Sequence, residues 1–304
     1  MKRETRLLLA GLMLSAPGCS DATGPLLDAG ERCGTRTDAV VTFADPALES
    51  RVRSALEIGS SDALTCARVT SLRFLGANGA GIASLAGAQN LIGLDELLLS
   101  GNSISDLSAL SRLTGITLLD LSENSVTNID ALSGLTNLIG LSLTRNSISD
   151  IGPLSGLAGL QLLALDHNSI SDLSPLAGLT SLVRLVLFNN SITDLSPLSR
   201  LTGLALLDLG ENSVPDLAPV SSLVELTVLG LDGASVTDVS PLTGLRLLTV
   251  LVLDDNSSLT NIRPLIDNTG IGRDDTVHLN GTEARCDDVA TLTSRGVIVF
   301  SECS

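Results

Sequence analysis

The sequence of 304 residues contains no tryptophan and no tyrosine, and phenylalanine occurs only four times. Its hydrophobic content of 44% is therefore carried mainly by leucine, isoleucine and valine. A core without large rings has to be built from narrow aliphatic layers that recur along the chain, which is typical of a repeat protein. The length alone allows one large domain or two of ordinary size.

Basic residues are scarce as well. Lys2 is the only lysine, and the formal net charge is −16. Contacts to nucleic acid depend on clusters of arginine and lysine, so an acidic chain without a basic run is a poor candidate for binding DNA or RNA. The same charge opposes electrostatic docking on anionic lipid.

The N-terminus has the pattern of a targeting signal. The basic stretch MKRETR precedes the apolar segment Leu7–Leu14, and SAPGC follows and ends at Cys19. The apolar segment is too short to span a bilayer as a helix, but it suits a signal peptide. One interpretation is an ordinary signal peptide that is cut near Ala16 and leaves Cys19 as a free thiol.

Small residues before a cysteine resemble the lipobox of bacterial lipoproteins, in which the cysteine is acylated and the preceding signal is removed. The resemblance implies a signal peptide over residues 1–18 and lipid on Cys19, and several acyl chains anchor a protein stably. Ser20, the next residue, resembles the sorting signal of the outer-membrane class. We therefore expect a lipid-anchored protein of the cell envelope, at the outer membrane of a Gram-negative bacterium and facing the periplasm or the exterior.

Four further cysteines stand in two pairs at the two ends of a repetitive middle segment: Cys33 and Cys66, then Cys286 and Cys303. Disulfides persist outside the cytoplasm, and four cysteines allow three pairings. The repeats hold the two ends many strands apart, which favours local disulfides at each end. A zinc site is the rival interpretation, but no CxxC or HxxxH spacing supports it.

The middle of the chain repeats every 22 residues around the pattern L-x-x-L-x-L-x-x-N-x-I. The asparagines of six consecutive repeats are Asn102, Asn124, Asn146, Asn168, Asn190 and Asn212. The next two steps fall on Ala234 and Asn256. L-x-L predicts a short strand with alternate residues in the core, and the asparagine amide carries donors and an acceptor for backbone groups of neighbouring coils. We therefore expect a ladder of stacked asparagines.

The return leg of each repeat places apolar residues at every third position, as at Ile104, Leu107 and Leu110, which is the period of 3₁₀ turns. Aspartates such as Asp106 come before this leg and are suited to capping its free N–H groups. Five of the repeats also carry a proline that presets the turn: Pro153, Pro175, Pro197, Pro219 and Pro241.

These repeats, with return legs similar to DLSPLSGLTNL, resemble the internalin-type subclass of bacterial leucine-rich repeats over residues 69–282. The resemblance implies an α/β-type repeat solenoid, a leucine-rich-repeat arc with a parallel concave β-sheet, a convex side of 3₁₀ and irregular structure, and an N-terminal helical cap. Residues 43–56 themselves predict that helix, with Asp45 at the N-cap and Pro46 at the first position. The expected divisions are a signal peptide at 1–18, a lipid-attachment cysteine and linker at 19–40, an N-terminal cap at 41–68, repeats at 69–282 and a C-terminal cap at 283–304.

Residues that could support catalysis are few and scattered. The two histidines, His167 and His278, lie five repeats apart, so they cannot share a site. Serines follow the ladder position with the period of the repeat, which makes them turn residues, and no P-loop, G-x-S-x-G or HExxH motif occurs. We expect no enzyme activity, no metal and no cofactor.

The residues that vary between repeats stand six, four and two positions before the ladder residue, on the outward side of the predicted strands. In solenoids this sheet is the concave, ligand-facing surface. We expect an apolar centre bordered by charge, in which Phe188 is the only aromatic residue of the three outward columns. The expected partner-binding residues are Arg145, Leu162, Ala164, His167, Arg184, Val186, Phe188, Leu206 and Asp208. The alternative is a solvated sheet with scattered apolar residues.

The C-terminal part of the same face is acidic. Asp232, Asp254 and Asp255 suggest calcium, although they lack the loop signature of a calcium site. The sequence therefore predicts a lipid-tethered module that binds a protein or another macromolecule through its concave face. The rival function is a structural or adhesive envelope protein that has no dedicated ligand.

The lipid anchor makes a direct prediction. Cys19→Ser removes the sulfur that would carry the acyl chains, so the protein should lose labelling by a palmitate analogue and appear in the soluble fraction of the cell envelope. Cell fractionation with metabolic labelling measures both. Membrane retention equal to that of the unmodified protein would contradict the assignment.

Overall fold

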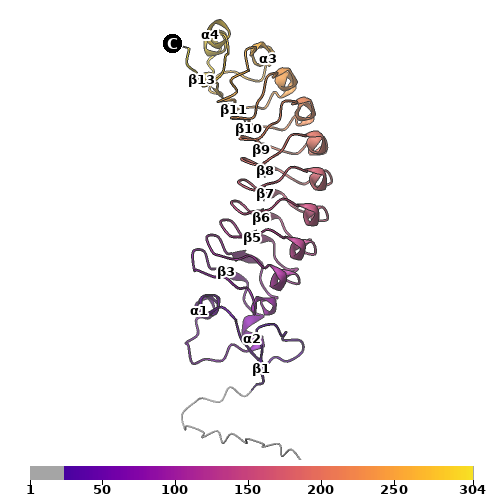
Figure 1. Cartoon of the computed structure of the whole chain (residues 1–304), viewed down its shortest axis with the longest axis vertical. Helices are drawn as coiled ribbons and strands as arrows, with labels where there is room; N and C mark the ends of the chain where they lie inside the picture. The colour runs from indigo at the N-terminus through magenta and orange to yellow at the C-terminus, as the bar shows by residue number, and fades with distance from the viewer. Residues whose placement is uncertain (1–23, 304) are drawn as a thin grey trace, which may run out of the picture.

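The structure, a computed structural model, describes residues 24–303. The expected signal peptide and Cys19 lie outside the described residues. Figure 1 shows the coils of the chain stacked in sequence order along one axis, with a column of short 3₁₀ turns on one side of the stack. The two ends of the stack are closed by helices.

One parallel sheet of eleven strands runs through the whole stack in sequence order. The strands are β3 (Phe74–Gly76), β4 (Glu96–Leu98), β5 (Leu118–Asp120), β6 (Gly140–Ser142), β7 (Leu162–Ala164), β8 (Arg184–Val186), β9 (Leu206–Asp208), β10 (Val228–Gly230), β11 (Val250–Val252), β12 (Thr276–His278) and β13 (Ile298–Phe300). Neighbouring strands of the regular repeats pair residues that are one repeat apart in the sequence, as Leu141 pairs with Leu163. Strands β3 to β12 each bury their middle residue, so their first and third residues face outward, whereas the middle residue of β13 is half-buried. The predicted fold class is confirmed.

The return legs form 3₁₀ turns, as the step of three predicts. They are η1 (Ala88–Asn90), η2 (Ser108–Leu110), η3 (Asp130–Leu132), η4 (Gly152–Leu154), η5 (Ser174–Leu176), η6 (Ser196–Arg200), η7 (Ala218–Ser222) and η8 (Ser240–Gly244). The carboxylate of Asp172 accepts the Ser174 N–H at 2.8 Å and the Ser174 hydroxyl at 2.9 Å. Both donors hold the pKa of Asp172 below its usual value. The repeated aspartates therefore cap the turns.

The asparagine ladder joins each coil to the one before it. Asn146 Oδ1 accepts the Val126 N–H at 2.9 Å, while its Nδ2 donates to the carbonyl oxygens of Leu121 and Leu143 at 3.0 Å each. One side chain thus satisfies three backbone groups, two of them on the preceding coil. Equivalent bonds to the preceding coil are made by Asn124, Asn168, Asn190 and Asn212.

The gap in the ladder at Ala234 is closed by the main chain. The Val214 N–H, which an asparagine at 234 would receive, donates instead to the Ala234 carbonyl oxygen at 2.9 Å. The side chain of Ala234 is fully buried, so this coil has no polar side chain at the ladder position. Asn256 resumes the ladder and binds the Val236 N–H at 2.7 Å. One missing amide is therefore accommodated without an orphaned donor at Val214.

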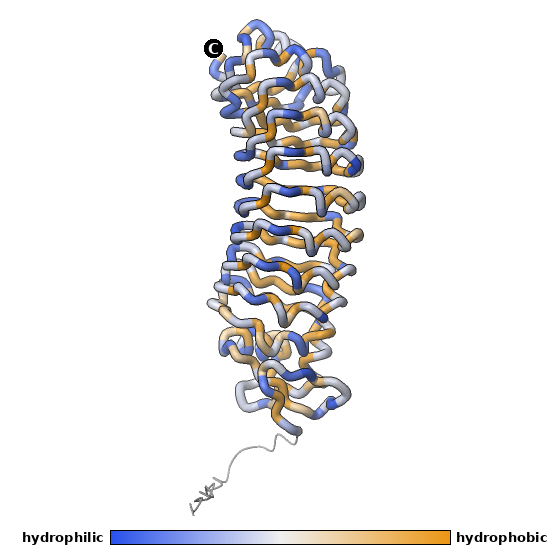
Figure 2. The backbone as a smooth tube through the Cα atoms, turned by 45° about the vertical axis from the view of Figure 1, so that its right-hand side comes forward, coloured by the Kyte–Doolittle hydropathy of each residue, from blue (hydrophilic) through white to orange (hydrophobic). Residues whose placement is uncertain are grey.

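The core is a column of aliphatic side chains between the sheet and the turns. Figure 2 shows the same succession of hydrophobic and hydrophilic segments recurring from coil to coil. Turn leucines such as Leu132 and Leu154 and strand leucines such as Leu119 are fully buried. Each buried leucine stabilises the fold by about 1.5–3 kcal/mol relative to exposure. The stack therefore needs neither rings nor a globular core.

The N-terminal end is closed by a small cap. Its elements are β1 (Leu26–Leu27), β2 (Val40–Val41), α1 (Pro46–Ala55) and α2 (Cys66–Val69). Asp45 caps α1 by accepting the Ala47 N–H at 2.9 Å, as predicted, and its second oxygen accepts the Ala83 N–H at 2.8 Å. The same carboxylate therefore fixes the helix to the first coil. Cys33 and Cys66 form the expected disulfide.

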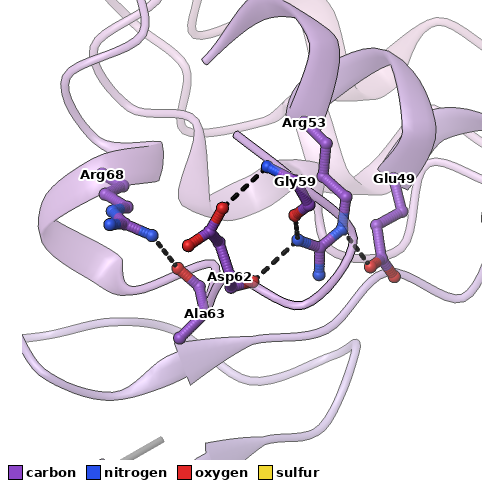
Figure 3. Close-up of polar contacts among 6 residues, drawn as sticks. All are labelled: Glu49, Arg53, Gly59, Asp62, Ala63 and Arg68. Atoms are coloured by element: carbon purple, nitrogen blue, oxygen red, sulfur yellow. Dashed lines mark hydrogen bonds and ion pairs between the residues drawn. The ribbon is translucent and has the colours of Figure 1, made fainter. Parts of the chain in front are cut away.

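The loop after α1 is held by Arg53. Its Nη1 donates to the carbonyl oxygens of Gly59 at 3.0 Å and Asp62 at 2.8 Å, and its Nε pairs with Glu49 at 2.8 Å (Figure 3). The Gly59 N–H donates in turn to the Asp62 carboxylate at 2.7 Å. These bonds fix the connection between α1 and α2.

At the C-terminal end the helices α3 (Arg263–Asp267) and α4 (Cys286–Ser294) replace the 3₁₀ turns. Arg295 donates to the carbonyl oxygens of Ile266 and Ile271, which links the end of α4 to the preceding coil. Cys286 and Cys303 form the second expected disulfide. Strand β13, which the sequence did not predict, extends the sheet by one strand beyond the last repeat. Within residues 24–303, no helix is long and apolar enough to cross a membrane.

The ladder predicts the cost of removing one asparagine. Asn146→Ala leaves the Val126 N–H without a partner and removes one of the two amide donors to each of the Leu121 and Leu143 carbonyl oxygens, so the free energy of unfolding should fall by about 1–3 kcal/mol. Urea denaturation measures this loss. Ser147→Ala, at the exposed neighbouring position, is the control and should change stability by no more than about 0.5 kcal/mol. Equal midpoints for both variants would show that the ladder does not stabilise the stack.

Candidate functional site

A shallow hollow of about 380 Å³ lies on the concave sheet over strands β5 to β8. We call it the apolar hollow. Its outward-facing lining residues are Leu98, Leu118, Asp120, Gly140, Ser142, Leu162, Ala164, Arg184 and Val186. Most of these side chains are apolar or small, so the hollow is suited to an apolar side chain of a ligand, which would be removed from water on binding.

One of the residues that line the apolar hollow is a glycine, so β6 has no side chain at that position. Gly140 stands between Leu118 and Leu162 in the same column of neighbouring strands. A Cβ on Gly140 would come within 2.6 Å of Leu118 Cδ1, so the leucine has moved over the space that the glycine leaves. Leu118 and Leu162 remain 36% and 43% exposed. They form two walls, and the small residues Ser142 and Ala164 lie beside them.

Opposite charges stand at the two ends of the apolar hollow. Asp120 is fixed, because its carboxylate accepts the Ser122 N–H at 2.9 Å and the Ser122 hydroxyl. Arg184, on β8, is exposed and forms no ion pair with any described residue. Its guanidinium therefore remains open to a ligand or to solvent.

The structure divides the nine expected partner-binding residues into two groups. Leu162, Ala164, Arg184 and Val186 line the apolar hollow. The other five lie outside it: Arg145, His167, Phe188, Leu206 and Asp208. The expected residues and the apolar hollow therefore overlap on β7 and β8, and the hollow continues from there over β6 and β5 to Leu98.

Phe188 is half-buried. A Cβ on Gly210, in the next coil, would come within 2.8 Å of Phe188 Cδ2, so the ring covers the space beside this glycine. Its other neighbour is the ring of His167, at 5.3 Å between centroids. The Phe188 side chain therefore packs against the next coil and does not stand free in solvent.

Arg145 and His167 occupy the turn that joins a strand to its ladder asparagine. Both have positive φ angles, 52° and 54°, which non-glycine residues seldom adopt. The turn places them one residue beyond the third outward column, at the edge of the concave sheet. His167 Nδ1 lies 2.8 Å from Nδ2 of Asn189, the equivalent residue of the next coil. These side chains border the sheet rather than the apolar hollow.

Carboxylates crowd the C-terminal half of the concave face. Burial raises the pKa of Asp208, the neighbouring Asp232 and Asp166 raise it further, and the Gly210 N–H at 3.2 Å opposes the rise. Within residues 24–303, no group of three or more acidic, histidine or cysteine side chains is arranged to hold a metal ion. The calcium site considered at the acidic repeats therefore has no geometric basis.

The sequence-based list missed two aromatic residues on the outward columns. Phe74 on β3 and Phe300 on β13 are 50% and 47% exposed, so Phe188 is not the only aromatic residue of this face. His278 stacks on Phe300 at 4.5 Å and lies 3.6 Å from the Asp254 carboxylate. Phe74 belongs to a degraded repeat whose outward position the pattern does indicate. Phe300 follows no repeat pattern, so the sequence carried no signal for it.

Parallel coils, 3₁₀ return legs and an asparagine ladder define the class of leucine-rich-repeat proteins, whose concave faces commonly bind other proteins. The family model "Leucine Rich repeats (2 copies)" matches residues 136–178. Two internalins of Listeria monocytogenes are similar in structure. Internalin C2 is 34% identical, with 80% of this chain and 94% of that chain covered and a TM-score of 0.61. Internalin F is 29% identical, with 86% and 90% covered and a TM-score of 0.67.

The chain therefore belongs to the internalin-type family of leucine-rich-repeat proteins. A more distant likeness is to the ectodomain of the Arabidopsis thaliana receptor kinase GASSHO1/SCHENGEN3, solved in complex with CASPARIAN STRIP INTEGRITY FACTOR 2. It is 21% identical, with 79% of this chain and 36% of that chain covered and a TM-score of 0.57, and it shows the fold alone. No curated protein matches the chain in sequence.

The raised pKa of Asp208 makes a signed prediction. A raised pKa means that folding disfavours the ionised form, so a stability cost is present above the folded pKa and disappears as the pH falls below the ordinary value of 3.8. Asp208→Asn should therefore raise the melting temperature at pH 7, and the gain should shrink as the pH approaches 4. Thermal unfolding followed by circular dichroism measures both.

Asp194→Asn is the matched control. The Ser196 N–H and hydroxyl lower the pKa of Asp194, so folding favours its ionised form above the ordinary pKa. This substitution should not raise the melting temperature at pH 7. The assignment fails if Asp208→Asn lowers stability at pH 7, or if its effect is the same at pH 7 and pH 4.

Proposed function

We propose that this protein is a lipid-anchored, extracytoplasmic binding module that captures a protein partner on its concave face. The apolar hollow is the single observation that carries the proposal. Its two leucine walls, Leu118 and Leu162, are more than a third exposed, and no described segment of the chain covers them. Apolar surface that gathers in one concave place marks a binding site more often than scattered apolar residues do.

The shape of the scaffold supports the same function. Consecutive strands lie about 4.8 Å apart, so the outward columns present side chains at a regular spacing along the stack. The ladder and the two capped ends hold this spacing, and a rigid surface loses little conformational entropy when a partner binds. A leucine-rich-repeat module is therefore suited to recognising a macromolecule that spans several coils.

Two features support a location outside the cytoplasm. Disulfides close both ends of the stack, and structural disulfides are typical of oxidising compartments. The N-terminal sequence resembles a lipoprotein signal that ends at Cys19. We infer attachment through Cys19 to the outer membrane of a Gram-negative envelope. Only a short segment separates this cysteine from β1, so the anchor would keep the N-terminal cap near the membrane surface.

We also infer a binding role without catalysis. The histidines lie on different coils, and each is next to an aromatic ring: His167 beside Phe188 and His278 beside Phe300. Among the described residues, the polar contacts of the two rings are to Asn189 and Asp254, and neither imidazole is hydrogen-bonded to a serine or cysteine. The rival function of spacer or adhesive is tested by the same experiment as the binding role.

Site-specific photocrosslinking in the native cell tests the proposal. A photoreactive residue in place of Leu162 should give a discrete crosslinked species with a protein partner, because that side chain would be covered in the complex. The same residue in place of Leu247, which is 49% exposed and outside the apolar hollow, should not give it.

The pattern of crosslinks separates the outcomes. A crosslinked species from Leu162 alone supports capture of a partner on the concave face. The proposal is contradicted if neither position gives a species, or if both give the same one. A species composed of two copies of this chain would support the self-associating rival.

A further inference from the structure

The concave face around the apolar hollow is strongly acidic. Across β4 to β11, the three outward columns contain one basic residue, Arg184. The acidic residues of the same columns are Glu96, Asp120, Asp166, Asp208, Asp232 and Asp254. A partner that lies along these columns therefore meets carboxylates in most directions from the hollow.

The acidic residues stand on both sides of the apolar hollow. Asp120 lies one strand from Gly140, the centre of the hollow, and Glu96 lies two strands away on the same side. Asp208 lies three strands away on the other side. At about 4.8 Å per strand, these carboxylates are about 5, 10 and 14 Å from the centre along the stack. An extended peptide spans such distances with two to five residues at about 3.3 Å per residue.

We propose that the apolar hollow receives an apolar side chain from a basic polypeptide segment, with lysine or arginine on both sides of that side chain. The occupant is defined by charge complementarity: the basic residues pair with Asp120 and Glu96 on one side and with Asp208 on the other. This inference rests on the proposed function of the concave face and adds the chemistry of its partner.

Arg184 sets where the basic residues of the partner can lie. It stands at the end of the apolar hollow without an ion pair among the described residues, so a partner cation placed directly beside it would be repelled. The next carboxylate in that direction is Asp208 on β9. Asp166, on the coil of β7, offers a counter-charge before Arg184, and Asp208 offers one beyond it, so the partner's basic residues on this side should lie on either side of Arg184 and not beside it. Repulsion of this kind contributes specificity against cations at the wrong spacing.

The same charges exclude two other occupants. A second copy of the chain would bring a net charge of −16 against an acidic face. An acidic peptide would place its carboxylates against Asp120 and Asp208, with Arg184 in the columns and Arg145 at the edge of the sheet as counter-charges. Both are opposed by like-charge repulsion, which is weakened only by salt.

Four fluorescein-labelled peptides test the proposal on the purified full chain by fluorescence anisotropy. They are GRGRLRGRG, its serine variant GRGRSRGRG, its acidic counterpart GEGELEGEG and the neutral peptide GSGSLSGSG. The leucine–arginine peptide should bind about tenfold tighter than the serine variant, because burying one leucine side chain is worth at least one factor of ten. The acidic peptide should not bind. Raising the salt concentration should weaken binding of both arginine peptides.

Matched variants of the protein locate the site. Leu162→Ser removes one wall of the apolar hollow and should abolish the preference for leucine over serine. Leu247→Ser makes the same change at a similarly exposed leucine elsewhere and should keep that preference. Arg184→Gln removes the repulsion and should tighten binding of both arginine peptides.

Three results would overturn the inference: equal affinity for the leucine and serine peptides, binding of the acidic peptide as tight as that of the basic one, or an unchanged preference in the Leu162→Ser variant. Each of these leaves the proposed function standing if a photoreactive residue at position 162 still captures a partner in cells. Absence of that crosslink, in contrast, removes the proposed function itself.

Discussion

The hydrogen bonds of the ladder asparagines, one in every regular coil except that of Ala234, determine the rest of this structure. Each ladder asparagine, such as Asn146, satisfies an N–H and a carbonyl group of the preceding coil and a carbonyl group of its own. Buried backbone groups without partners cost about 1–3 kcal/mol each, so the turn is stable only when coils are stacked in one register. The register then fixes the parallel sheet, the 22-residue offset between strands and the positions of all outward side chains.

The function depends on the outward side chains, because the fixed register sets their positions but not their identities. The core positions are occupied by aliphatic residues in every coil. The outward positions lie outside this core, and their residues differ from coil to coil. At the apolar hollow, Gly140 leaves space that the side chain of Leu118 leans over, and Leu162 stands on its other side. The carboxylates that flank it are separated by whole coil spacings. A ligand is therefore selected by the spacing of its groups along the stack as much as by their chemistry.

The fold could be predicted from the sequence because its structural residues recur with a fixed period. The binding surface could not be predicted equally well, because its residues differ from repeat to repeat. The ladder, the turn caps at residues such as Asp172 and both disulfides follow from spacing and position, and the structure contains them. The expected binding residues overlap the apolar hollow on β7 and β8 alone, because a glycine such as Gly140 gives no signal of a binding surface in the sequence. Strand β13 and Phe300 lie beyond the last repeat, where no pattern remains to extrapolate.

Amide hydrogen exchange tests the central claim that the ladder holds the concave face in one geometry. The Val126 and Ile148 N–H groups donate to Asn146 and Asn168, not to a strand or helix partner. If the ladder is continuous, these amides should exchange as slowly as those of the central strands, because they open only when coils separate. Exchange at the rate of exposed turn amides would show that the coils move independently, and the account would be wrong.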